Sequence, residues 1–317
     1  MKVILAQPRG FCAGVERAIE IVERALQIYG APIYVRHEIV HNAFVVENLR
    51  KKGVVFVNEI NEVPEGGVTI FSAHGVAKEV ESQAKTRNLP IIDATCPLVT
   101  KVHKEAITME EEGREVILIG HAGHPEVIGT SGRVKGKAII IEKIEDIEKI
   151  DIKDPEKLSY VTQTTLSVDD TKGIIEALKT KYPNIKGPGT KDICYATQNR
   201  QNAVRELAKK VDILLVIGSR NSSNSNRLRE IGIENAIDSY LINGVGDIND
   251  NWFLDKKTIG ITAGASAPEE LTTSVTTYLQ TKYSAQIEIM DGRIENIKFK
   301  LPWDKSGPPE LMELVES

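Results

Sequence analysis

The sequence predicts an α/β protein made of three similar modules, each with parallel strands covered by helices. Three observations lead to this prediction. A short apolar strand pattern leads into a cysteine that opens a helix, and this arrangement occurs at Cys12, Cys96 and Cys194. The strand after each of these helices ends in a polar loop at a nearly fixed distance from the cysteine. The 317 residues also exceed the usual size of a single hydrophobic core.

Each cysteine lies between a strand and a helix. The strands are expected at residues 1–6, 90–93 and 191–193. The helices are expected at residues 15–28, 98–112 and 199–210. Gly30 and Gly113 stand just past the first two helices, where glycine is favoured because it adopts a left-handed backbone without strain. The chain therefore uses its three cysteines at one repeated structural position.

Two further strands in each module end in polar loops. The first loops hold His41, His124 and Ser222, which lie 29, 28 and 28 positions after their cysteines. The second loops hold His74, Thr164 and Ser266, at 62, 68 and 72 positions. Loop insertions account for the looser second match. Since ligands of open α/β sheets bind beyond the carboxyl ends of the strands, these loops are the expected ligand-binding elements.

The repeat is circularly shifted relative to the chain ends. The strands before Cys96 and Cys194 close the first two modules, so residues 1–6 are left to close the third. The expected organisation is an N-terminal strand at 1–12 that joins the third module, modules at 13–95, 96–193 and 194–282, and a C-terminal hairpin and tail at 283–317. The hairpin is expected because apolar residues alternate on both sides of the turn pair Asp291-Gly292.

Composition narrows the class of protein. The net charge of -5 and a pI near 5.8, without a cluster of Lys and Arg, argue against a nucleic-acid surface. No segment approaches the ~20 apolar residues that span a bilayer, and the chain does not open with a signal-peptide pattern. The expected location is cytoplasmic, where three cysteines are not a disulfide framework.

Three cysteines at equivalent positions indicate a metal centre. If the modules surround a pseudo-threefold axis, Cys12, Cys96 and Cys194 meet at its centre. Three thiolates leave one iron of a [4Fe-4S] cluster without a protein ligand, and an open iron is a Lewis acid for a substrate oxygen. Structural zinc is the weaker alternative, because the sequence has no close-set pair such as C-x-x-C.

The polar loops and the cysteine segments also match a known pattern. The segments are Arg9-Gly-Phe-Cys12-Ala-Gly14-Val, Asp93-Ala-Thr-Cys96-Pro97, Gly120-His-Ala-Gly-His124-Pro-Glu126, Thr162-Gln-Thr164-Thr-Leu-Ser, Ser219-Arg-Asn-Ser222-Ser223-Asn224-Ser-Asn and Thr262-Ala-Gly-Ala-Ser266-Ala-Pro. Together, from Met1 to about Lys282, they resemble the 4-hydroxy-3-methylbut-2-enyl diphosphate reductase family. The resemblance implies three modules around a central [4Fe-4S] cluster held by the three cysteines. It also implies a two-electron reductive dehydroxylation that yields isopentenyl and dimethylallyl diphosphates.

A diphosphate substrate calls for several small hydrogen-bond donors, and the polar loops supply them. The expected substrate-binding residues are His41, His74, His124, Thr164, Ser222, Ser223, Asn224 and Ser266. For Ser266 the alternative is a helix N-cap, because Glu269 follows three residues later. For residues 222–226 the alternative is a flexible polar loop.

Loss of a hydroxyl group needs a proton donor. Glu126 is the only residue of the repeat-matched loops with a carboxyl group. We therefore expect it to be the catalytic acid, with Thr164 relaying its proton to the substrate oxygen. The alternative is that Glu126 only offsets the charge of nearby histidines. His37, His103 and His121 have no repeat-matched partner and are expected to be surface or supporting groups.

The electrons are expected to come from an outside protein of the ferredoxin or flavodoxin type, because the sequence has no glycine-rich nucleotide loop. Two other functions stay open at this point. One is another open-cluster [4Fe-4S] enzyme, such as quinolinate synthase or a cluster-dependent dehydratase, although a dicarboxylate would call for arginines and Arg220 is the lone candidate in these loops. The other is a non-enzymatic iron-sulfur sensor, which the charge pattern does not favour.

Overall fold

The computed structural model of the chain describes residues 1–189 and 191–302. The chain divides into two compact units. Unit 1 comprises Met1–Glu16, Val40–Asn48 and Tyr195–Lys298, and unit 2 comprises Arg17–Ile39, Leu49–Cys194 and the chain from Phe299 on. None of the helices in the described residues combines the length and the apolar composition needed to cross a bilayer.

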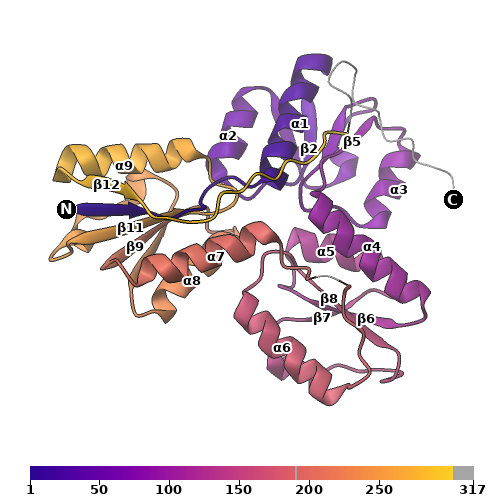
Figure 1. The fold of residues 1–317 in the computed structure, drawn as a ribbon. Coiled ribbons are helices and arrows are strands. Elements are labelled where there is room, and N and C mark those ends of the chain that lie inside the picture. Colours follow the sequence, from indigo (N-terminus) through magenta and orange to yellow (C-terminus); the bar gives the residue numbers. More distant parts are fainter. Residues whose placement is uncertain (190, 303–317) are drawn as a thin grey trace. The chain divides into compact units, whose positions relative to one another are not determined.

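Among its described residues, unit 1 has a five-stranded parallel sheet in the order β10-β9-β11-β1-β12 (Figure 1). Its strands are β1 Lys2–Leu5, β9 Ile213–Ile217, β10 Asp238–Ile242, β11 Thr258–Ala263 and β12 Gln286–Ile289. Its helices are α7 Tyr195–Ala208, α8 Ser223–Glu234 and α9 Glu269–Tyr283, with 3₁₀ turns at Val245–Asp247 and Asp250–Phe253. Lys2 of β1 lies opposite Thr258 of β11 and Gln286 of β12. The N-terminal strand thus lies in the sheet of the third module, as expected from the strands before Cys96 and Cys194.

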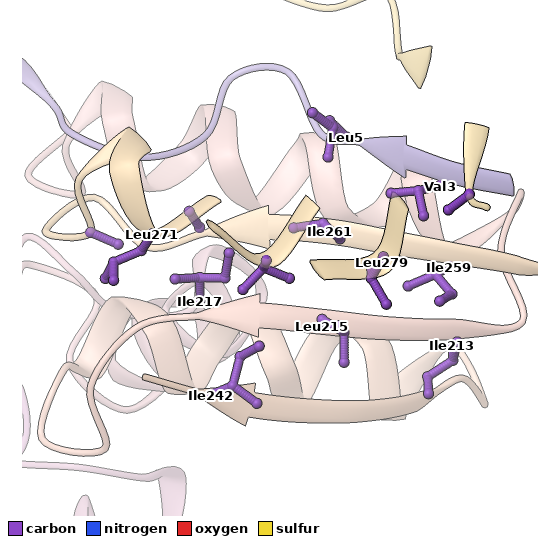
Figure 2. Packing of buried hydrophobic residues seen from close by; sticks show 14 of the residues in the cluster. Val3, Leu5, Ile213, Leu215, Ile217, Ile242, Ile259, Ile261, Leu271 and Leu279 are labelled. Atoms are coloured by element: carbon purple, nitrogen blue, oxygen red, sulfur yellow. The ribbon is translucent and has the colours of Figure 1, made fainter. Parts of the chain in front are cut away.

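The sheet of unit 1 is buried on both faces, as is usual for parallel strands joined by helices. Figure 2 shows the face that packs with α9, where the labelled side chains are Val3, Leu5, Ile213, Leu215, Ile217, Ile242, Ile259, Ile261, Leu271 and Leu279. On the other face, Ile4 and Val216 pack with Leu207 of α7 and Leu228 of α8. These two cores fix the carboxyl ends of the strands, from which the polar loops start.

In the described part of unit 2 the strands form two parallel sheets, in the orders β3-β2-β4-β5 and β7-β6-β8. The strands are β2 Ile33–Arg36, β3 Val54–Val57, β4 Thr69–Phe71, β5 Ile91–Asp93, β6 Glu115–Ile119, β7 Ile139–Ile141 and β8 Leu158–Thr162. The helices are α3 Lys78–Thr86, α4 Pro97–Glu111, α5 Pro125–Ser131 and α6 Val168–Lys181, with 3₁₀ turns at Ile60–Glu62 and Ile144–Asp146. Helices α1 Ala13–Tyr29 and α2 Ala43–Lys51 have residues in both units.

The same strand order recurs in the three sheets. The strand that follows each cysteine helix is β2, β6 or β9, and it pairs with the next strand on one side and with the second-loop strand, β4, β8 or β11, on the other. Beyond that strand lie β5 in the first sheet and β1 in the third. This recurrence confirms the predicted α/β class with three related modules. The boundaries at 95/96 and 193/194 stay predictions.

The strand predicted at residues 191–193 is wrong. The second sheet is closed instead by a single parallel bridge between Ser159 and Lys186. Asp192 approaches the strand with its side chain, and its Oδ2 accepts the N–H of Thr162 at 2.9 Å. The Asp192 carboxylate therefore accepts the N–H of Thr162 that a backbone carbonyl of a neighbouring strand would otherwise accept. A strand pattern in the sequence does not reveal this replacement.

The predicted C-terminal hairpin is also wrong. Residues 286–289 form β12, which runs parallel to β1, and residues 291–302 form no strand. The chain reaches β12 through helix α9, and such a crossover delivers a parallel strand to the open edge of β1. Ile294 is 74% exposed, so the apolar residues of the expected second strand are not buried by pairing. The predicted tail from residue 303 on lies outside the described residues.

Candidate functional site

The three cysteines occupy one backbone position, at the start of a helix. Helices α1, α4 and α7 begin at the residue that follows Cys12, Cys96 and Cys194 respectively. The N–H group of each cysteine donates to a carbonyl of a second polar loop, Cys12 to Ala265 at 3.1 Å, Cys96 to Ala73 at 3.0 Å and Cys194 to Thr164 at 3.0 Å. The equivalence that sequence spacing predicted is therefore present in the backbone hydrogen bonds.

The surroundings of the cysteines suit negatively charged sulfur ligands. All three are half-buried and none is in a disulfide. The N-terminus of a helix carries a partial positive charge, which favours a thiolate there. Burial lowers the pKa of Arg17, and the negative charges of Asp93 and Cys96 act in the opposite direction, so a cation faces Cys96. Cys12 belongs to unit 1, whereas Cys96 and Cys194 belong to unit 2.

A buried acid and a buried hydroxyl group pair in unit 2. Glu126 lies in the first turn of α5 and Thr164 just beyond β8, and both are at least 95% buried. The N–H and Oγ1 of Thr164 donate to the two carboxyl oxygens of Glu126, at 2.6 and 3.0 Å. Burial raises the pKa of Glu126 to about 7 against the lowering effect of these two bonds, and the charge of Asp192 adds to the rise. Glu126 can therefore hold a proton at neutral pH.

Two predicted histidines lie beside this pair. The rings of His74 and His124 meet edge to face, with their centroids 5.8 Å apart. His124 caps α5, where its Nδ1 accepts the N–H of Glu126 at 3.2 Å. Accepting at Nδ1 leaves Nε2 of a neutral His124 as its N–H donor. His74 Nδ1 lies 3.3 Å from the hydroxyl of Ser72. Unit 2 thus gathers His74, His124, Glu126 and Thr164 in one region, as the loop pattern predicted.

Unit 1 gathers the remaining predicted residues around the start of α8. This helix begins at Ser223, so the alternative of a flexible polar loop over residues 222–226 is excluded, and Ser223 and Asn224 lie in a helical first turn. Ser222 is the N-cap, and its Oγ accepts the N–H of Ser225 at 3.3 Å. A long helix that begins with small polar residues offers backbone N–H groups to an anion.

Asn224 and Ser266 have distinct environments in this region. Asn224 is 4% exposed, and within the described residues neither its Oδ1 nor its Nδ2 has a hydrogen-bond partner. Because buried polar groups normally have hydrogen-bond partners, a buried amide without one indicates a position where a polar ligand would supply them. The hydroxyl of Ser266 donates to the carbonyl of His41 at 2.9 Å, and α9 begins at Glu269 with Pro268 as its cap. The alternative of Ser266 as an N-cap is therefore excluded.

The histidines without repeat partners have supporting or surface positions. His121 is exposed near Glu142. His103 is buried in α4, and burial, followed by the charge of Arg133, lowers its pKa to about 3, so its imidazole is neutral. A Cβ atom on Gly75 would stand 2.6 Å from His103 Cε1, so only glycine, at φ +77°, fits beside this ring. His103 thereby supports the loop that carries His74.

Sequence reasoning missed Asp192. Its side chain joins Thr162 of β8 to Lys101 of α4, at 2.9 Å in each case, and its charge acts on Glu126. A signal was present, since an acidic residue shortly precedes Cys96 and Cys194 alike, as Asp93 and Asp192. Its role could not be read from this spacing, because the first acid lies in a strand and the second does not.

Comparisons with known proteins give the family. A family model described as LytB protein matches residues 3–280. The 4-hydroxy-3-methylbut-2-enyl diphosphate reductase of Burkholderia pseudomallei (strain 1026b) is 58% identical over 302 residues, which cover 95% of this chain and 96% of the relative. The structure of E-1-hydroxy-2-methyl-but-2-enyl-4-diphosphate reductase from Plasmodium falciparum is 40% identical, with a TM-score of 0.92 and 95% of each chain covered. A second solved structure, described as the terminal enzyme of the non-mevalonate pathway, is 34% identical with a TM-score of 0.63, over 89% of this chain and 100% of that chain. Because the family model spans most of the sequence and these relatives match over nearly their whole length, the chain belongs to the LytB protein family.

Proposed function

We propose that this chain reduces 4-hydroxy-3-methylbut-2-enyl diphosphate to isopentenyl and dimethylallyl diphosphates, the last step of the non-mevalonate isoprenoid pathway. The reaction consumes two electrons and two protons and releases the hydroxyl group as water. The observation that supports the proposal is the buried Glu126–Thr164 pair, in which the raised pKa of Glu126 allows it to hold a proton at neutral pH and the carbonyl of Thr164 accepts the N–H of Cys194. The names of the relatives agree with this reaction.

Cys12, Cys96 and Cys194 would hold a [4Fe-4S] cluster. Within the described residues of either unit, no three potential metal ligands are gathered, and the cysteines are divided between the units. The ligand set is therefore inferred from the repeated position of the cysteines at helix N-termini and from their exposure. When bound, such a cluster supplies electrons and a Lewis-acidic iron for the departing oxygen.

The other proposed site residues would supply a proton and bind the diphosphate. Glu126 supplies a proton through the hydroxyl of Thr164 to the substrate oxygen. The Thr164 Oγ1 lies 3.0 Å from Oε2 of Glu126, and a hydroxyl can accept from the protonated acid while it donates onward. His74 and His124 offer N–H donors in unit 2. In unit 1, the side-chain Oδ1 and Nδ2 of Asn224 are available to a ligand. The polar loops of the same unit also hold Ser222, Ser223, Ser266 and His41. These groups would bind the diphosphate.

The proposed enzyme needs an electron donor, and we assign this role to an outside protein of the ferredoxin or flavodoxin type. We also assign it to the cytoplasm, because its cysteines form no disulfide. A dicarboxylate-binding enzyme gains no support, since Arg220 is the one arginine of the first and second polar loops in the described chain, and it is exposed. The relatives are named as reductases, which does not favour an iron-sulfur sensor.

The test is turnover of the allylic diphosphate under anaerobic conditions with a chemical reductant and cluster-loaded protein. Formation of both five-carbon diphosphates at the expense of the substrate is the expected result. Stable binding of a cluster without consumption of the substrate would instead favour a sensor, and turnover of a dicarboxylate would favour another open-cluster enzyme. A chemical reductant removes the dependence on the natural electron donor.

A further inference from the structure

Each cysteine helix carries a cation near its start. The cations are Arg17, five positions after Cys12 in α1, Lys101, five positions after Cys96 in α4, and Arg200, six positions after Cys194 in α7. None of the three belongs to the polar loops that supply the proposed substrate-binding residues. Their side chains reach the backbone that leads into a different cysteine, and the contacts follow one cyclic order along the chain.

Arg17 acts on the peptide that precedes Cys96. Its Nη1 donates to the carbonyl oxygen of Thr95 at 3.1 Å, and its Nε donates to the carbonyl of Lys300 at 2.7 Å. The Thr95 carbonyl belongs to the same peptide group as the N–H of Cys96, which donates to Ala73 at 3.0 Å. This peptide plane is therefore held at both ends, which fixes the direction in which Cys96 leaves the backbone.

Arg200 acts in the same way on the peptide that precedes Cys12. It is fully buried, and its Nη2 donates to the carbonyls of Phe11 at 3.1 Å and Gly10 at 2.7 Å, while its Nε also donates to Gly10 at 3.0 Å. Nη1 donates to the Ala196 carbonyl at 3.0 Å and to Glu295 at 3.1 Å, so every N–H group of the guanidinium is used. The N–H of Cys12 donates to Ala265, so this peptide too is held at both ends.

Lys101 reaches the chain before Cys194 with a different chemistry. Its Nζ donates to the Asp192 carboxylate at 2.9 Å and to the Lys191 carbonyl at 3.3 Å. The second oxygen of Asp192 accepts the N–H of Thr162. A lysine has no planar fork with which to span a peptide, so it holds this segment through a carboxylate that is itself bound to a strand.

We propose that Arg17, Lys101 and Arg200 are positioning residues, each of which fixes the backbone before the next cysteine in the cyclic order Cys12, Cys96, Cys194. Each helix thus holds the ligand loop of another module, and hydrogen bonds behind metal ligands are known to orient them. The assignment to a cluster rests on the proposed function. The positioning of the loops does not, and it is measurable in metal-free protein.

The test compares the rates at which an alkylating reagent modifies the three cysteines of reduced, metal-free protein, each followed by mass spectrometry. Arg17→Met is expected to accelerate modification of Cys96, Lys101→Met that of Cys194, and Arg200→Met that of Cys12. The expected factor is about 10 or more, which corresponds to the loss of one charged hydrogen bond that keeps a segment closed. The cysteine on the same helix as each variant should keep its wild-type rate.

Matched controls remove a cation from the same helices. Arg24→Met, Lys104→Met and Arg205→Met lie further along α1, α4 and α7 and should leave all three rates unchanged. Arg200→Lys should retain part of the protection of Cys12, since the lysine ammonium can reach one carbonyl. If Arg200→Met fails to fold because Glu295 keeps a buried charge, Arg200→Met combined with Glu295→Gln replaces it.

Two results would overturn the proposal. One is an equal acceleration of all three cysteines, which is the result of a general loss of stability, and the other is acceleration of the cysteine on the variant's own helix. Iron content after anaerobic reconstitution supplies a second readout, and the three Met variants should retain less iron than their controls. If the wild type binds no iron, the proposed function fails. If the wild type binds iron but the Met variants accelerate all three cysteines equally, the positioning role alone is refuted.

Discussion

At the residue scale, the protonation state of Glu126, the proposed proton donor, depends on one balance of opposing effects. Burial favours the neutral acid, while the two hydrogen bonds from Thr164 favour the carboxylate, and burial is the larger effect. The nearby charge of Asp192, held by Lys101 and Thr162, shifts the balance further toward the acid. A carboxyl group that titrates near neutral pH is suited to general acid catalysis in the cell.

We expect Glu126→Gln to keep the cluster and the substrate affinity but to turn over more slowly by at least ~10², the usual contribution of a general acid. Thr164→Val should lose less, because water can replace the hydroxyl group. Wild-type turnover should fall as the pH rises through about 7, where Glu126 loses its proton. Steady-state rates with excess chemical reductant measure these effects. Near wild-type turnover in Glu126→Gln would show that the proton has another source.

Glu126 also predicts a pH dependence of stability. Its pKa is raised from 4.5 to about 7 in the folded state, so between these values the folded chain holds a proton that the unfolded chain has released. The free energy of unfolding should therefore decrease as the pH rises from 4.5 to 7, by on the order of 3 kcal/mol from this group. Denaturant unfolding at several pH values in this range measures this dependence. The free energy of unfolding should decrease less steeply with pH in Glu126→Gln than in the wild type, and an equally steep decrease would argue against a buried neutral acid.

Asn224 separates a binding role from a structural one. Removing a buried amide that has no partner relieves a desolvation cost of about 1–3 kcal/mol, so Asn224→Ala should be at least as stable as the wild type. Its KM for the diphosphate should rise about 10-fold or more, since a ligand contact is lost. Asn235→Ala is the control at the other end of α8, where the amide donates to Ile231 at 2.7 Å. This control should lose stability and keep its KM, and the reverse pattern would contradict a ligand role for Asn224.

At the element scale, the N-terminal strand supports the sheet on which Cys12 depends. Strand β1 lies between β11 and β12, and its side chains enter the cores on both faces. The residues between β1 and Cys12 are then held by Arg200 and by β11, since the N–H of Gly10 donates to Ala263. A change in β1 should therefore disturb unit 1 as a whole.

Leu5→Ala should lower the free energy of unfolding by about 2–5 kcal/mol, the usual cost of a cavity at a buried leucine. Lys2→Ala provides the control on the same strand, because its partner Glu288 is solvent-exposed and such surface pairs contribute at most about 1 kcal/mol. Chemical denaturation measures both values. Equal small losses in the two variants would show that β1 is not part of the core.

Sequence patterns predicted elements well where a segment decides its own structure. The strands predicted at 211–217 and 257–262 are present as β9 and β11, whose two faces are buried. The residues at 191–193 and 294–301 have similar local patterns, but their outcome depends on distant groups. Asp192 turns its carboxylate to Thr162, and the edge of β1 is taken by residues 286–289. Such competition between segments is not visible in local periodicity.

The candidate site follows the same rule. Repeat spacing found the cysteines and the polar residues, because each lies just beyond a strand end. It did not find Arg17, Lys101 or Arg200, which stand inside helices where a cation is usually a solvated residue. Arg17 and Arg200 bind backbone carbonyls that precede another cysteine, and Lys101 binds the Lys191 carbonyl and the Asp192 carboxylate. Local sequence patterns do not show which distant groups a helix cation will reach.

At the scale of the whole molecule, three sheets of one strand order each present a cysteine on a shared backbone position. Each cysteine stands at the start of its own module's first helix. The N-terminal strand β1, which leads into Cys12, pairs with β11 in the third sheet. This arrangement gives the three cysteines equal status. If the three cysteines hold one metal centre, none of them can be replaced without loss of that centre.

The most direct test is the iron content and turnover of anaerobically reconstituted wild type and of Cys12→Ser, Cys96→Ser and Cys194→Ser. The wild type should hold about four iron atoms per chain and reduce the allylic diphosphate. Each serine variant should lose bound iron and activity, and by a similar extent, because the three positions are equivalent. A variant that keeps a complete cluster and wild-type turnover would contradict the claim that all three cysteines hold the group on which the reaction depends.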